Sequence, residues 1–159
     1  MAVVAETTAQ VLVSDTITLP EPAEKVDEIV ASVRDLACFV INNKVIFQGI
    51  LHKQIFFVDL NGFVRHVGVD IPFSSFVDLP GVLAGQSCQL TPSIAFLTFQ
   101  LLSPTMLRET VIIDIRVTVT DTPSNTVTFT NTLPQRPLSF GAPNSIRVNS
   151  SGIVSNSTM

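Results

Sequence analysis

Charged and aromatic side chains are scarce in this chain of 159 residues, which contains neither Trp nor Tyr. Asp, Glu, Lys and Arg together make up 14% of it, against roughly 25% in an ordinary soluble domain. The nine basic residues are scattered, so no positive stripe can follow a phosphate backbone, and no Trp or Tyr ring offers a stacking surface. We therefore expect no nucleic-acid partner.

Long apolar runs are also missing, because none approaches the roughly 20 residues of a membrane-spanning helix. The opening residues, MAVVAETTAQVLVSD, lack the basic start of a signal peptide and reach Glu6 too early for its apolar core. The sequence thus predicts a product that is made in the cytoplasm without a membrane span. Such a product reaches the outside of a cell by lysis or by another release route.

Patterns typical of catalytic and metal sites are absent as well. No GxSxG nucleophile motif and no glycine loop of the phosphate-cradling kind occurs. The two cysteines, Cys38 and Cys88, lie in apolar runs outside any CxxC or Cys/His spacing. Buried free thiols are favoured over a disulfide, which remains the alternative. We expect no catalytic residues, no metal, no cofactor and no enzymatic activity.

The clearest positive pattern is a β-hairpin over residues 44–80 that turns at Asn61-Gly62. Asn-Gly between alternating apolar runs favours a two-residue type I′ turn, because both central residues adopt positive φ. This turn would pair Leu60 with Phe63 and place Lys53 opposite Asp70. One face, taken as the core side, would carry Phe56, Val58, Val67, Val69 and Ile71, and a mixed second face would carry Leu51, Ile55 and Phe57 among polar residues. The same register would point His52 and His66 to opposite faces, so they are not predicted to share a metal.

The remaining segments also read as strands. Residues 9–19 form an opening strand that stops at Pro20, and residues 21–27 form a short turn or helical piece before a strand that ends at Ile41. Residues 94–102 and 108–120 alternate, with Val111, Ile113, Ile115, Val117 and Val119 on one face. After a short strand at 126–130, the end is rich in Pro, Ser, Asn and Gly but carries spaced apolar residues. We predict an all-β, antiparallel β-sandwich with extended N- and C-terminal arms.

Two motifs in the hairpin suggest a family. Val45-Ile46 followed by Gly49, and Ile71-Pro72-Phe73-Ser74 followed by Phe76, resemble the SPOCS domain, the spore-coat and spore-morphogenesis domain of endospore-forming Firmicutes. The likeness covers about residues 20–121 and is most specific over residues 44–81. It implies a β-rich module in structural spore-envelope proteins that bind one another, with no enzymatic activity known.

Together these patterns predict an N-terminal strand or arm at 1–20, a SPOCS-like β domain at 21–121, and a C-terminal strand with an extended assembly arm at 122–159. The hypothesis is a self-assembling structural protein, the subunit of a spore-associated or extracellular filament, tube or layer. Its copies would join by β-strand addition, with other spore-envelope proteins as further partners. The alternative is a non-polymeric adaptor that recruits such proteins through the Ile55 and Phe57 face. The candidate assembly residues are Val11, Val13, Ile17, Ile55, Phe57, Val127, Phe129, Phe140, Ile146, Val148, Ile153 and Val154.

Overall fold

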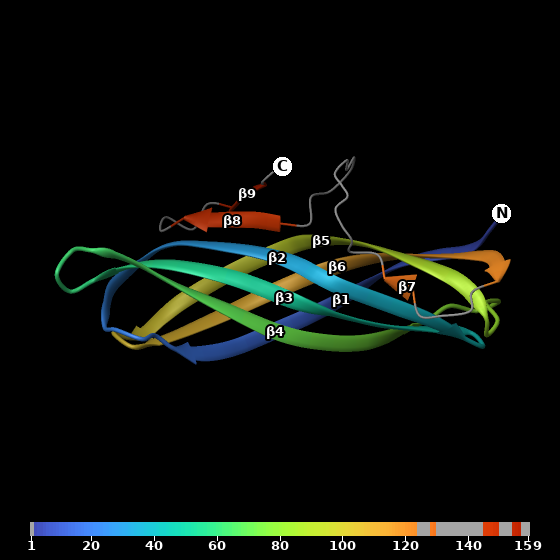
Figure 1. Cartoon of the computed structure of the whole chain (residues 1–159), viewed down its shortest axis with the longest axis horizontal. Helices are drawn as coiled ribbons and strands as arrows, with labels where there is room; N and C mark the ends of the chain where they lie inside the picture. The colour runs from blue at the N-terminus through green and yellow to red at the C-terminus, as the bar shows by residue number, and fades with distance from the viewer. Residues whose placement is uncertain (1, 124–127, 130–144, 150–153, 157–159) are drawn as a thin grey trace.

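The computed structural model describes residues 2–123, 128–129, 145–149 and 154–156, and all its regular elements are strands. Two antiparallel sheets face one another (Figure 1): one has the order β1-β6-β5, and the other has the order β4-β3-β2, extended by β8 and β9 and joined by β7. The predicted antiparallel β-sandwich is therefore confirmed. The strands are β1 (Val3–Thr18), β2 (Ala23–Ile41), β3 (Lys44–Asp59), β4 (Val64–Asp78), β5 (Gln86–Ser103), β6 (Met106–Pro123), β7 (Thr128–Phe129), β8 (Ser145–Asn149) and β9 (Val154–Asn156).

The core lies between the two sheets and follows from the alternation within each strand. Strand β6 lies in the middle of its sheet, and Val111, Ile113, Ile115, Val117 and Val119 all point inward with no exposed surface, as predicted. Strand β2 runs unbroken from Ala23 to Ile41. The segment expected to include a turn or helical piece at 21–27 is thus largely strand, because Ala23, Lys25 and Val26 pair with β3.

The β3–β4 hairpin turns where it was predicted, but its register differs from the prediction by one residue. Val58 pairs with Val64, so His52 rather than Lys53 lies opposite Asp70. The Asp59 carboxylate explains the longer loop, because it accepts hydrogen bonds from the backbone N–H groups of Asn61 and Phe63, each at 2.9 Å.

This shift changes which side chains share a face, because a one-residue slip moves a whole strand's side chains relative to its partner. Leu51, Ile55 and Phe57 now share their face with Val67, Val69 and Ile71. That face is the core side, and Ile55 and Phe57 have no exposed surface. The expectation that these two residues lie on a partly exposed face was wrong, and in this fold they cannot present a docking surface.

A disulfide between Cys38 of β2 and Cys88 of β5 links the two sheets. Their Cα atoms are 6.3 Å apart, and both residues are buried. The preference for free thiols was therefore wrong. Its physical reason is tertiary: β2 and β5 lie side by side along one edge of the sandwich, and no local spacing in the sequence indicates that contact.

Candidate assembly surfaces

The residues predicted to mediate assembly fall into three groups. Val11, Val13, Ile55 and Phe57 belong to the core, and Ile17 is half-buried against it. A second set lies in the short C-terminal strands: Phe129 in β7, Ile146 and Val148 in β8, and Val154 in β9. Val127, Phe140 and Ile153 lie outside the described residues. The second group is the one that adds strands to an existing sheet.

The C-terminal strands occupy the edge of β2 that β3 leaves open (Figure 1). β8 pairs antiparallel with β2 from Glu28↔Asn149 to Ser32↔Ser145, and β9 pairs with β8. β7 adds a shorter contact at Ala37 and Cys38. Within the described residues, the C-terminal segment is thus joined to β2 by the 5 residues of β8 and the 2 residues of β7, although β2 is 19 residues long.

Strand β1 forms a long sheet edge. It pairs with β6 from Val3↔Thr120 to Thr18↔Met106, so the predicted N-terminal arm is a strand of its own sandwich. Its 16 residues contain no Pro, Gly, Lys or Arg, which are the residues that usually block edge-to-edge pairing. The edge strands β4 and β5, by contrast, each contain a proline, Pro72 in β4 and Pro92 in β5. The edge of β1 thus carries no proline, but it contains a bulge between Val3 and Ala5.

The outer face of the β4-β3-β2 sheet carries an apolar row. Phe39, Ile46 and Phe76 are neighbours on β2, β3 and β4, and 44% of Phe39 and 58% of Phe76 are exposed. The Lys44 ammonium lies 4.6 Å from the centre of the Phe76 ring. Sequence analysis missed this row because the predicted register assigned the even-numbered residues of β3 to the core.

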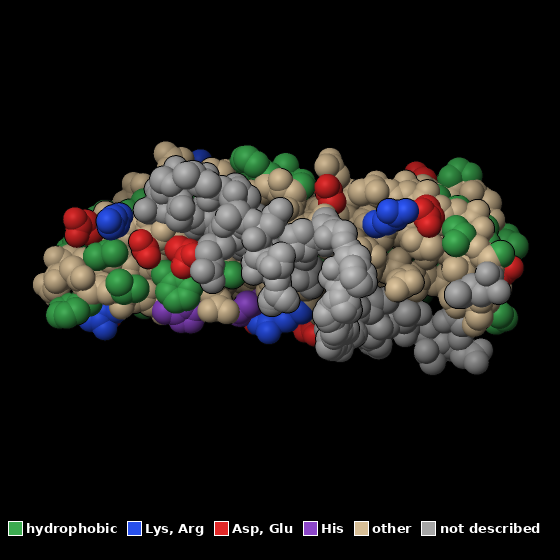
Figure 2. Space-filling model, turned by 90° about the horizontal axis from the view of Figure 1, so that it is seen from above, with side chains coloured by type: hydrophobic (Ala, Val, Ile, Leu, Met, Phe, Trp, Pro, Cys, Tyr) green, Lys and Arg blue, Asp and Glu red, His purple; other side chains and the backbone are tan. Residues whose placement is uncertain are grey.

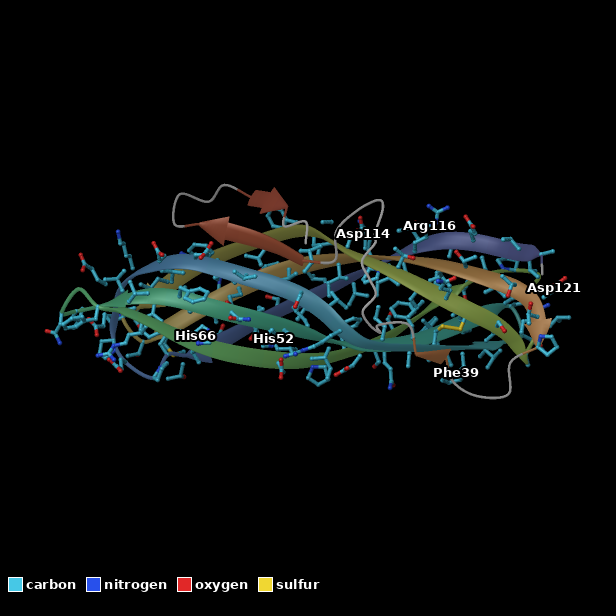
Figure 3. The ribbon with its side chains drawn as sticks, turned by 45° about the horizontal axis from the view of Figure 1, so that its top comes forward. Phe39, His52, His66, Asp114, Arg116 and Asp121 are labelled. Atoms are coloured by element: carbon cyan, nitrogen blue, oxygen red, sulfur yellow. A yellow bond between two sulfur atoms is a disulfide. The ribbon has the colours of Figure 1, made fainter. Side chains whose placement is uncertain are left out.

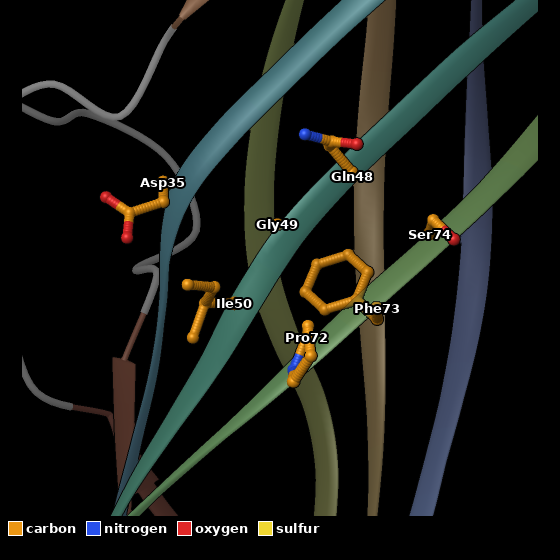
Figure 4. Close-up of a pocket in the computed structure, with 7 residues that line it drawn as sticks. All are labelled: Asp35, Gln48, Gly49, Ile50, Pro72, Phe73 and Ser74. Atoms are coloured by element: carbon orange, nitrogen blue, oxygen red, sulfur yellow. The ribbon is translucent and has the colours of Figure 1, made fainter.

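A hollow of about 580 Å³ lies beside this row (Figure 4). Its floor is formed by the ring of Phe73, which covers Gly49 so closely that a Cβ on Gly49 would lie 2.8 Å from Phe73 Cζ. Asp35, with φ of 57°, lies at its rim, where β2 bulges between Arg34 and Ala37. The bulge and the glycine shape this surface.

A polar cluster crosses the same outer face. Arg34 Nη2 lies 2.6 Å from His52 Nδ1 and 3.2 Å from Asp70 Oδ1, and His52 Nδ1 lies 2.5 Å from the same carboxylate oxygen. Hydrogen bonds from His52 and then Arg34 lower the pKa of Asp70. These contacts link β2, β3 and β4 across the outside of the sheet.

The two histidines both lie on this outer face (Figure 3), contrary to the expectation that they point in opposite directions. The cause is the corrected register, which pairs His66 with Phe56. The His66 ring contacts Phe56 with a centroid distance of 4.9 Å, whereas His52 contacts Asp70. Among the residues that the structure places, no group of three or more His, Cys, Asp or Glu side chains could hold a metal ion.

Charge is sparse over the surface. Figure 2 shows acidic and basic side chains scattered over the visible face between apolar and neutral ones. None of the described residues forms a helix long and apolar enough to cross a membrane.

One comparison with known proteins gives a match. A family model described as "SipL, SPOCS domain" matches residues 22–102 of the chain. The matched residues begin just before β2 and end within β5, so they include the whole β4-β3-β2 path and the apolar row on its outer face. No curated protein and no solved structure matches the chain.

Proposed function

The chain belongs to the SipL SPOCS-domain family, and from that premise we propose that it is a self-assembling structural protein of the spore envelope. Its copies polymerise by exchanging the C-terminal strand β8 between subunits. In the polymer, β8 of one copy pairs with the β2 edge of the next copy. The result is a filament, tube or layer at the spore surface or outside the cell.

The observation that supports this proposal most directly is the pairing of β8 with β2. It unites a sheet edge near the start of the chain with a strand near its end. Residues 130–144 connect β7 to β8, and a connection of that length reaches up to about 50 Å when extended. The same main-chain hydrogen bonds can therefore form between two copies.

Geometry favours an open assembly. Each copy carries one donor strand and one acceptor edge, so exchange is head-to-tail and continues unless the rotation between copies closes a ring. The low content of charged residues, 14% of the chain, reduces electrostatic repulsion between copies. The Cys38–Cys88 disulfide is typical of proteins that work in an oxidising environment, which fits a location outside the cytoplasm.

The test is to delete residues 131–159 and examine the purified protein by negative-stain electron microscopy and size-exclusion chromatography. We expect wild-type polymers and a monomeric deletion variant with an unchanged β-sheet circular dichroism spectrum. The variant keeps the acceptor edge but has no donor. When it is mixed into assembling wild type below equimolar amounts, it should shorten the polymers.

Two results would contradict the proposal. If polymers of the deletion variant equal those of wild type, the C-terminal donor is excluded. A wild-type protein that remains a compact monomer at high concentration excludes polymerisation altogether. As a control on specificity, Ile146→Pro with Val148→Pro removes two backbone N–H groups from β8 and should reproduce the deletion.

A second candidate function, a non-polymeric adaptor, is favoured by the outer-face row in which the exposed Phe39 and Phe76 flank the half-buried Ile46. Such a row on a sheet face fits recruitment of another spore-envelope protein. An adaptor would elute as a monomer or dimer with or without residues 131–159. Its affinity for a purified envelope protein would fall on Phe39→Ser with Phe76→Ser, whereas polymers formed by strand exchange would persist in that variant.

A further inference from the structure

A buried cluster of three charged side chains lies between the two sheets, apart from the proposed assembly surfaces. Lys53 of β3 and Glu109 of β6 have no exposed side-chain surface, and Asp15 of β1 is 24% exposed. Lys53 Nζ donates a hydrogen bond to Asp15 Oδ1 at 2.8 Å and another to Glu109 Oε1. Burying three charges in an apolar core is costly, so the arrangement calls for a reason.

The two carboxyl groups stand side by side. Asp15 and Glu109 are direct partners in the β1–β6 register, which brings their Cβ atoms within roughly 5.5 Å. Lys53 of β3 reaches them from the opposite sheet. Glu109 Oε2 is buried and has no hydrogen-bond partner. A cluster that served only as a salt bridge would normally satisfy each buried oxygen, so one oxygen of this cluster is left free for another task.

We propose that this cluster forms an amide bond between Lys53 Nζ and Asp15 Cγ, so that the protein cross-links β3 to β1 by itself. The reactants are the Lys53 ammonium and the Asp15 carboxylate, and the products are one amide and one water. The N–C bond forms, one C–O bond of Asp15 breaks, and no oxidant or further reactant is needed. Glu109 carries protons and is regenerated unchanged.

The proton transfers follow from the contacts. Glu109 takes a proton from Lys53 Nζ, which frees the nitrogen electron pair to attack Asp15 Cγ. Glu109 passes this proton to the departing oxygen of Asp15 and then relays a second proton from the nitrogen of the tetrahedral intermediate to the same oxygen, which leaves as water. Burial raises the pKa of Glu109 even though Lys53 opposes the shift, which makes this carboxylate a stronger proton acceptor.

The fold supplies the conditions that this condensation needs. The amine and the carboxylate are already in contact, and such positioning replaces a bimolecular encounter. The site is dry, which disfavours the ions relative to the neutral amide. Asp15 rather than Glu109 is the acyl partner because its side chain reaches the rim of the core, where the released water can escape. Glu109 is enclosed on all sides.

The cross-link joins β1 to β3, whereas the proposed strand exchange uses β8 and β2. Each proposal can therefore be tested without the other. The cross-link would hold β1, an edge strand, permanently against the opposite sheet.

The decisive measurement is the intact mass of the full-length wild-type protein after reduction and denaturation. We expect a mass lower by one water than the sequence requires. Digestion should yield a branched peptide that joins the segment around Asp15 to the segment around Lys53. A wild-type mass equal to that of the sequence would overturn the proposal, and this reading does not depend on the folding of any variant.

Variants assign the roles. Lys53→Arg and Glu109→Gln should each have the full mass that their own sequences require. If Glu109→Gln still loses a water, Glu109 is not the proton carrier. If the branched peptide joins Lys53 to Glu109, the assignment to Asp15 is wrong. The exposed pair Lys44 and Asp78 is the matched internal control, because it should remain unlinked and Lys44→Arg should still lose one water.

Discussion

At the scale of single residues, the contact between Gly49 of β3 and Phe73 of β4 shows how the lack of a side chain at one position makes room for the ring of a neighbouring strand. A Cβ on Gly49 would lie 2.8 Å from both Phe73 Cζ and Leu36 Cδ2. The Phe73 ring therefore fills the space that a side chain at position 49 would occupy. This glycine belongs to the motif that first suggested the family, and the structure gives its presence a steric reason.

We predict that Gly49→Ala lowers the free energy of unfolding by about 1–3 kcal/mol, because Phe73 and Leu36 must shift to accommodate the methyl group. Gly68→Ala is the matched control, since the nearest atom to its added Cβ is His52 Cε1 at 3.8 Å. That change should stay within about 0.5 kcal/mol. Urea unfolding monitored by circular dichroism measures both values. Equal effects of the two substitutions would contradict the steric explanation.

At the scale of elements, β2 is the strand on which most of the fold depends. It pairs with β3 on one side and with β7 and β8 on the other, and its Cys38 is bonded to β5. The disulfide closes a loop with a sequence separation of 50 residues. A cross-link of that span restricts the unfolded chain considerably, so its main effect is expected on stability.

We predict that Cys38→Ala with Cys88→Ala lowers the free energy of unfolding by about 2–4 kcal/mol, because the unfolded chain regains loop entropy. Reducing the wild-type protein with dithiothreitol should lower it by a similar amount, which separates loss of the bridge from any cavity that alanine leaves. The denatured, unreduced wild type should show no free thiol in a colorimetric assay. Free thiols there, or no response to reductant, would count against the bridge.

At the scale of the whole molecule, the two ends of the chain play different parts. β1 contributes Val11 and Val13 to the core and Asp15 to the buried cluster, and it pairs with β6 along its length. β8 pairs with β2 over a short stretch. The first end is part of the sandwich, whereas the second is attached to an edge that exists without it.

We therefore predict opposite outcomes for two truncations. Deleting residues 2–20 uncovers β6 and leaves Lys53 and Glu109 without Asp15. We expect the decrease in the free energy of unfolding to be comparable to the total stability of an ordinary domain, about 5–15 kcal/mol. That variant should show no cooperative thermal transition by circular dichroism. Deleting residues 131–159 should leave a cooperative transition within a few degrees of wild type. Comparable melting of both variants would show that β1 is not integral to the fold.

Much of the architecture could be predicted from local pattern. Alternation in β6 indicated that Val111, Ile113, Ile115, Val117 and Val119 share a face, which proved to be the core side, and Asn61-Gly62 marked a turn that the structure contains. At the C-terminus, a short strand at 126–130 was predicted and β7 lies within it, but strands β8 and β9 and their pairing with β2 were not predicted. The row of Phe39, Ile46 and Phe76 was missed because the predicted hairpin register assigned Ile46 to the core face and so separated it from Phe76.

The sequence by itself determined which residues of each strand share a face, because that property depends only on the two-residue repeat of an extended backbone. It also determined the all-β class and the family to which residues 22–102 belong. The tertiary structure alone decided the hairpin register, the bond between Cys38 and Cys88, and the meeting of Asp15, Lys53 and Glu109. Each of these depends on contacts between residues far apart in the chain, which only packing of the two sheets can select.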